Sequence, residues 1–149
     1  MREIKIFTIG FTKKSAEKFF GLLKESGAKR IIDIRLNNVS QLAGFAKRDD
    51  LKYFAKELCD MDYVHIPELA PSEDILKEYK KGKGSWSDFE SQFLNLMKER
   101  QVETTISEEI LDHGCLLCSE NEPDNCHRKL VADYFQQKWG REISISHLI

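Results

Sequence analysis

The motif Cys126-His127-Arg128 contains the side chains of this chain that are best suited to chemistry, because it lies where a helix is expected to begin. The first turn of a helix offers unpaired N–H groups and the positive end of the helix dipole. A thiol at that place has a lowered pKa, which a neighbouring arginine lowers further, and the same N–H groups bind phosphate or carboxylate. The motif predicts a nucleophilic or redox-active Cys126, with His127 moving the proton. The alternative is a simple capping turn in which Arg128 is a solvated charge.

A second pair of reactive side chains, Cys118 and Glu120, follows a short apolar run that predicts a buried strand. Cys118 and Cys126 are eight positions apart and could form a reversible disulfide across one loop, the alternative being an ordinary buried thiol. Glu120 is a candidate proton carrier, or else the structural partner of an arginine. Because side chains alternate along a strand, Cys115 and Cys118 should point to opposite faces of the sheet. Cys115-Leu116-Leu117-Cys118 is therefore not expected to be a redox pair.

Asp33 and Arg35 close a second apolar run, and His65 closes a third. A charged pair at the end of an apolar strand is either an ion pair at the sheet edge or a substrate clamp. Arginine suits bidentate contact with phosphate or carboxylate, so we expect Asp33, Arg35, His65 and Arg128 to bind the substrate. The alternative for His65 is a histidine whose hydrogen bonds are satisfied within the fold.

A zinc site could also be assembled from these residues. Cys118, Cys126 and His127, with His65 or another ligand, would supply the donors, but their spacing matches no common zinc pattern. We therefore assign no metal ligands, and the sequence leaves the cofactor unknown.

The elements that must position these residues alternate between β-rich and helical patterns. Strands are predicted at 4–9, 31–34, 63–66, 115–118 and 143–146. Helices are predicted between Ser15 and Gly27, from a cap at Asp50 through Leu58, from Ser72 through Tyr79, from a capping box at 87–90 through Met97, over Val102 to Ile110, and from Asp124 or Asn125 to Gly140. This order predicts one α/β domain over residues 1–149, with a mostly parallel five-stranded sheet flanked by helices.

Ligands of such sheets bind outside the carboxyl ends of the strands, where the candidate residues should meet. The leading hypothesis is a thiol-dependent enzyme or a binding protein for an anionic ligand, phosphate-bearing or nucleotide-like. The alternative is a metal-binding or nucleic-acid-binding protein without turnover. Whether the protein is an enzyme stays open at this point.

The composition and charge of the chain argue against some classes of binding partner. The 149 residues include 23 Lys and Arg against 25 Asp and Glu, a net charge of −2 that argues against a general nucleic-acid coat. A basic run at 77–83 beside Tyr79 and Trp86 could bind nucleic acid, although such runs are more often solvated. The chain has no long apolar run and no signal-like start, so we expect a cytoplasmic protein that does not enter membranes. The oligomeric state is not readable from the sequence.

The chain resembles the domain-of-unknown-function family 488 (DUF488). The motifs that carry the resemblance are Thr8-Ile9-Gly10, Asp33-Ile34-Arg35-Leu36, Gln41-Leu42-Ala43-Gly44-Phe45, His65-Ile66-Pro67-Glu68-Leu69-Ala70-Pro71, Leu117-Cys118-Ser119-Glu120, Cys126-His127-Arg128 and His147-Leu148. The chain departs from the family at Phe11-Thr12, where many relatives carry His-Ser, and in loop 37–40, where many carry a proline. The resemblance supports the α/β fold and the position of the site, and it implies no particular reaction.

Overall fold

Five parallel strands form one sheet in the computed structural model, which describes residues 3–11, 13–36, 44–80, 85–118, 127–140 and 142–149. The strands are β1 (Ile4–Gly10), β2 (Arg30–Asp33), β3 (Asp62–His65), β4 (Gly114–Cys118) and β5 (Ile143–Leu148). They lie in the order β3-β2-β4-β1-β5, and every neighbouring pair is parallel. The predicted α/β class with a parallel five-stranded sheet is confirmed, and β5 is an edge strand as expected.

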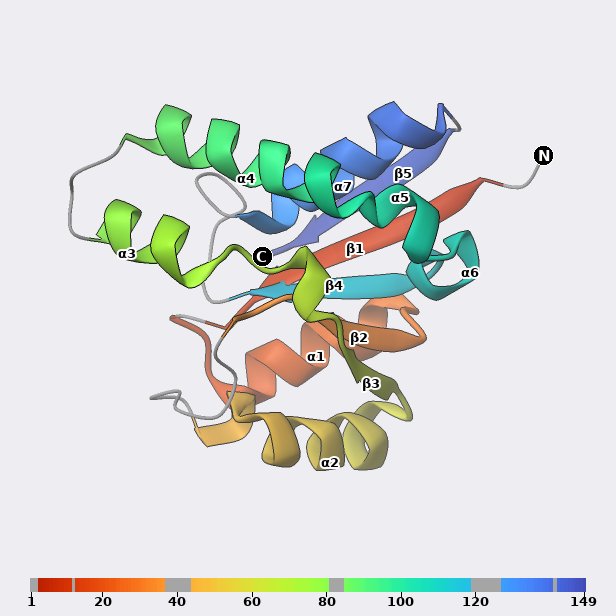
Figure 1. The fold of residues 1–149 in the computed structure, drawn as a ribbon. Helices are drawn as coiled ribbons and strands as arrows, with labels where there is room; N and C mark the ends of the chain where they lie inside the picture. Colours follow the sequence, from red (N-terminus) through yellow and green to blue (C-terminus); the bar gives the residue numbers. More distant parts are fainter. Residues whose placement is uncertain (1–2, 12, 37–43, 81–84, 119–126, 141) are drawn as a thin grey trace.

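Helices cover both faces of the sheet (Figure 1). One face is covered by α1 (Ala16–Ser26), α2 (Arg48–Cys59) and the short 3₁₀ helix η1 (Gly44–Ala46). The other face is covered by η2 (Pro67–Leu69), α3 (Glu73–Lys80), α4 (Trp86–Arg100), α5 (Val102–Thr105), α6 (Glu108–Leu111) and α7 (His127–Trp139). This arrangement explains why the strands are apolar on both sides.

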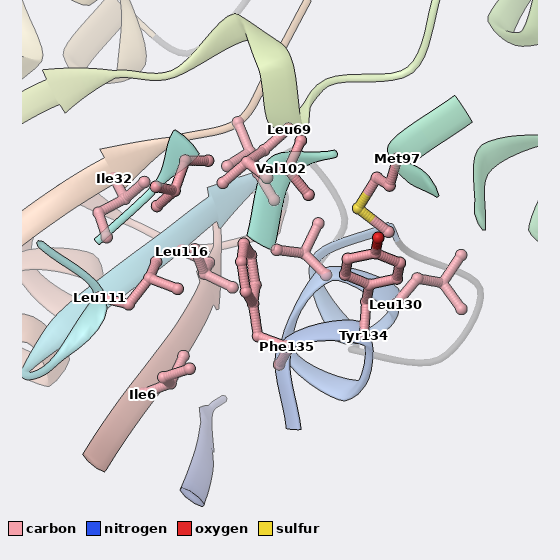
Figure 2. Close-up of a cluster of buried hydrophobic side chains, with 14 of the residues drawn as sticks. Ile6, Ile32, Leu69, Met97, Val102, Leu111, Leu116, Leu130, Tyr134 and Phe135 are labelled. Carbon is pink, nitrogen blue, oxygen red and sulfur yellow. The ribbon is translucent and has the colours of Figure 1, made fainter. Parts of the chain in front are cut away.

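Each face of the sheet has its own buried apolar cluster. On β4, Leu116 and Cys118 belong to the cluster under α4 and α7, whereas Cys115 and Leu117 belong to the cluster under α1 and α2. Figure 2 shows Leu116 on the first of these faces, among aliphatic and aromatic side chains from the strands and helices around it. The prediction that Cys115 and Cys118 face opposite sides is therefore confirmed.

The helix starts show where local sequence signals were sufficient. Ser15 caps α1 as predicted, accepting a hydrogen bond from Lys18 N at 3.1 Å. The predicted capping box at 87–90 is wrong by two residues, because α4 is capped by Ser85 and Asp88. The earlier start places the Trp86 ring in a stack on Phe89, with centroids 5.0 Å apart.

Two further helix predictions need correction. Asp50 does not cap α2, which begins after Lys47 without a side-chain cap. Asp50 instead lies in the first turn together with Asp49, where the helix dipole favours acidic side chains. The helix predicted over Val102 to Ile110 is two short helices, because Ile106 has extended backbone (φ −105°, ψ 123°) and Ser107 caps α6.

Replacing Gly114 by alanine is expected to lower the free energy of unfolding by about 1–3 kcal/mol, the usual range for an overpacked core. An added Cβ would lie 2.5 Å from Ile32 Cδ1 and 3.1 Å from the carbonyl oxygens of Ile110 and Leu111. Urea denaturation measures the loss. Gly21→Ala in α1 is the matched control, because its Cβ meets nothing within 4 Å and alanine favours helix. Equal stability of the two variants would contradict this close approach.

Candidate functional site

The carboxyl ends of the central strands meet the start of α7 at one edge of the sheet. Gly10 pairs in register with Cys118, and Asp33 pairs with both Leu117 and His65. Six of the candidate residues lie at this edge: Asp33, Arg35, His65, Cys118, His127 and Arg128. The other two, Glu120 and Cys126, lie outside the described residues.

The Asp33 carboxylate is buried and fully surrounded by donors. Oδ1 accepts from Arg35 N at 3.1 Å and from Arg35 Nε at 2.8 Å, and Oδ2 accepts from Arg35 Nη2 at 2.8 Å. The Tyr63 hydroxyl also donates to Oδ2. Burial alone would raise the pKa of Asp33, but the hydrogen bonds and charge of Arg35, helped by Tyr63, hold it below its ordinary value. Asp33 is therefore an ionised carboxylate that orients the Arg35 guanidinium.

Tyr63 was not among the sequence candidates. It lies two residues before His65 on β3, the neighbour of β2, so it shares a face with the strand end that pairs with Asp33. The sequence signal that could have identified Tyr63 is its position two residues before the candidate His65. That signal points to Asp33 only once β2 and β3 are known to be neighbours.

The Nη1 nitrogen of Arg35 donates no hydrogen bond to the described residues. Arg35 is 3% exposed, and its Nη1 is the single buried side-chain nitrogen or oxygen without a hydrogen-bond partner in the described part of the chain. The guanidinium carbon lies 5.5 Å from the centre of the Phe11 ring. A buried donor without a partner costs about 1–3 kcal/mol, so this nitrogen is a place where an acceptor would be favourable.

The two histidines of the site are held in the same way. His127 Nε2 lies 2.7 Å from the carbonyl oxygen of Ile34, and His65 Nε2 lies 2.9 Å from that of Arg35. A carbonyl can only accept, so each Nε2 carries the proton, and a neutral ring keeps its lone pair on Nδ1. Burial lowers the pKa of His127 to about 4, against the opposing effect of the Ile34 carbonyl. His127 is therefore neutral at pH 7.

Arg128 is completely buried, so the alternative that it is a solvated charge is wrong. Its Nη1 donates to Cys118 Sγ at 3.2 Å and its Nε donates to Thr8 Oγ1 at 3.3 Å. Thr8 Oγ1 is also 2.6 Å from His147 Nδ1. Thr8 and His147, to which the sequence analysis gave no site role, thus connect Arg128 to β1 and β5.

The three cysteines that the structure describes fall into two groups. Cys118 is disulfide-bonded, whereas Cys115 and half-buried Cys59 are free. Burial raises the pKa of Cys115 far above its ordinary value, and the Arg128 charge offsets only part of that effect. The described residues contain no group of three or more His, Cys, Asp or Glu able to hold a metal ion. The zinc alternative depends on Cys126, which is outside the described residues.

The aromatic residues beside the basic run belong to the packing of the fold. Tyr79 lies 5.1 Å from Phe89 and 5.8 Å from Trp86, measured between ring centres, and both Tyr79 and Trp86 pack on the cluster beneath α4. Stacking surfaces that are already used inside the fold give no support to a nucleic-acid interface here. Within the described ranges, every helix is too short or too polar to cross a bilayer.

The chain was compared with models of known protein families, with curated proteins and with solved structures. The family model described as "Domain of unknown function DUF488" matches residues 15–135, a range that includes all the candidate site residues. No curated protein and no solved structure matches the chain.

Proposed function

The chain belongs to the DUF488 family, and because the description of that family assigns no activity, we propose a function from the site itself: binding of an anionic ligand, phosphate-bearing or nucleotide-like, at the carboxyl edge of the sheet. The observation that carries the proposal is the unpartnered Nη1 of Arg35. Asp33 holds the other side of this guanidinium, so Nη1 is presented in a fixed direction without needing to reorganise.

The charges of the described residues favour an anion at this edge. Two guanidinium groups, those of Arg35 and Arg128, are buried at this edge together with the carboxylate of Asp33. The start of α7 adds its positive dipole end, and His127 links that helix start to Ile34, next to Arg35.

A carboxylate of the protein could compete for the same place. Segment 119–126, outside the described residues, contains Glu120, Glu122 and Asp124 in its sequence. In that case Arg35 would be satisfied by the fold, and added anions would have no effect.

Turnover, where it occurs, would use the thiol of the Cys-His-Arg motif. Cys126 directly precedes α7 in the sequence, and we propose it as the nucleophile. The neutral His127 ring has its lone pair on Nδ1 and can accept a proton, and Glu120 is the second candidate for proton transfer.

Arg35→Lys is expected to abolish stabilisation by phosphate while leaving the protein folded. Lysine keeps a positive charge beside Asp33 but lacks the forked nitrogen that Arg35 presents as Nη1. In wild type, inorganic phosphate or adenosine monophosphate at ten times its Kd should add about 1.4 kcal/mol, which raises Tm by about 3–6 °C. Thermal unfolding with and without each anion measures the difference.

Arg30→Lys is the matched control. Arg30 lies at the other end of β2, where its Nη1 donates to the carbonyl oxygens of Ile110 and Asp112. This variant should lose some stability but keep the full response to phosphate. Either an absent response in wild type or an equal response in Arg35→Lys would refute the anion site and favour a protein carboxylate on Arg35.

A further inference from the structure

Cys118 and Arg128 form a second chemical feature of the same edge, and it does not depend on Nη1 of Arg35, which carries the proposed anion site. We infer that the disulfide of Cys118 is a reversible redox element, whose reduced form is stabilised by the Arg128 guanidinium. The inference rests on three observations together: Cys118 is disulfide-bonded, its Sγ lies 3.2 Å from Arg128 Nη1, and both side chains are buried.

The contact between Arg128 and sulfur favours the reduced form over the disulfide. A sulfur atom in a disulfide carries no net charge and is a weak acceptor, whereas a thiolate carries a full negative charge. Cys118 is 1% exposed and Arg128 is 0% exposed, so water screens their attraction little. Reduction therefore creates an attraction that the oxidised form has only weakly, which makes this disulfide easier to reduce.

The guanidinium is held in place independently of the sulfur. Arg128 Nε donates to Thr8 Oγ1, and Thr8 is held in turn by His147 Nδ1 at 2.6 Å. Arg128 is also the second residue of α7, so its backbone belongs to a helix. The cation is thus already in position when the thiolate forms, and little reorganisation opposes the reaction.

Cys115 is an internal comparison three residues earlier on the same strand. It is free, completely buried, and belongs to the apolar cluster on the opposite face of the sheet. Burial raises its pKa strongly although Arg128 acts in the opposite direction. Burial without direct contact thus keeps a thiol protonated here, and the direct contact with Arg128 sets Cys118 apart.

The reductant of this reaction is a dithiol. Its first thiolate attacks the sulfur bonded to Cys118, the S–S bond breaks, and Cys118 leaves as a thiolate beside Arg128. The second thiol of the reductant then attacks the mixed disulfide, which closes the reductant into a cyclic disulfide and releases the other cysteine as a thiol. Two electrons pass to the protein, one proton stays on the second cysteine, and one proton goes to solvent. The sequence suggests Cys126, which lies outside the described residues, as that second cysteine. Its thiol would then be available as the proposed nucleophile only in the reduced protein.

The experiment measures two quantities: the equilibrium constant for reduction of the Cys118 disulfide, and the pKa of the Cys118 thiol once it is reduced. Wild type is equilibrated with mixtures of reduced and oxidised dithiothreitol, alkylated with iodoacetamide and mapped by mass spectrometry. Non-reducing peptide maps identify the partner cysteine. Cys118 should be alkylated with an apparent pKa at least one unit below the ordinary thiol value of about 8.5, and Cys115 should stay unlabelled.

Arg128→Met should reduce the equilibrium constant for reduction by dithiothreitol at least tenfold and raise the pKa of the Cys118 thiol. Arg128→Lys should restore most of both values, because it returns the charge. If Arg128→Met does not fold, Thr8→Val replaces it, since it removes the Nε contact and keeps the cation; a smaller shift in the same direction is expected. Arg35→Lys should leave both values unchanged, which separates this inference from the anion site.

Several outcomes would overturn the inference. The first is a Cys118 found as a free thiol in protein kept in air-saturated buffer. The second is a reduced wild-type Cys118 that titrates at or above the ordinary thiol value. The third is a folded Arg128→Met or Thr8→Val variant with the wild-type equilibrium constant.

Discussion

Asp33→Ala is expected to lower the free energy of unfolding by about 3–5 kcal/mol, because it leaves a buried guanidinium without its carboxylate. Arg35 would lose both bonds of its side chain to Asp33, from Nε and from Nη2. The half-buried Tyr63 hydroxyl would lose the same acceptor. Urea denaturation at pH 7, fitted to a two-state transition, measures the loss.

Asp49→Ala is the matched control for that experiment. Asp49 also pairs with an arginine, Arg48, but the two side chains are 86% and 49% exposed. An exposed pair of this kind is worth about 0–1 kcal/mol, so the control should remain close to wild type. A similarly small effect of Asp33→Ala would mean that the guanidinium is compensated by another group, and the argument from Arg35 would lose its basis.

The fold was predictable because its strand and helix patterns are local. Runs such as residues 31–34 and 115–118 are apolar without alternation, which is typical of strands covered on both faces. Caps were less certain, since both Ser85 with Asp88 and Ser87 with Glu90 match a capping box. In the structure the helix begins after Ser85, and this start allows the Trp86 ring to stack on Phe89.

The site was predictable in position but not in its contacts. The rule that ligands bind at the carboxyl ends of parallel strands placed Asp33, Arg35 and Cys118 at one edge. The bonds from Tyr63 to Asp33 and from Thr8 to His147 depend on which strands are neighbours, and the sequence does not contain the strand order in any local signal. The same reason explains why the sequence left two interpretations of Arg128 open, a substrate-binding residue or a solvated charge, and its complete burial excludes the second.

The stability of the protein is expected to fall as the pH decreases from 6.5 to about 4, because of His127. In the folded state burial lowers the pKa of His127 from 6.5 to about 4. The unfolded chain therefore takes up a proton at a pH where the folded protein does not, and acid favours unfolding. The contribution is fully present above pH 6.5 and is lost through this window, to a total of about 3 kcal/mol.

His127→Asn should remove most of this pH dependence, because asparagine does not titrate. Urea unfolding of wild type at pH 7, 6, 5 and 4.5 should show a slope approaching about 1.4 kcal/mol per pH unit, and the variant should have a much smaller slope between pH 6.5 and 5. His113→Asn, at the opposite edge beside Asp112, removes a histidine without touching His127 and should keep the wild-type slope. Asp33 and Glu103, whose pKa values are also lowered in the folded protein, add a loss at the acid end of this range in wild type and variant alike. A wild type whose stability is constant from pH 7 to 4.5 would show that His127 is not held neutral, and would remove the basis for its role as a proton acceptor at the site.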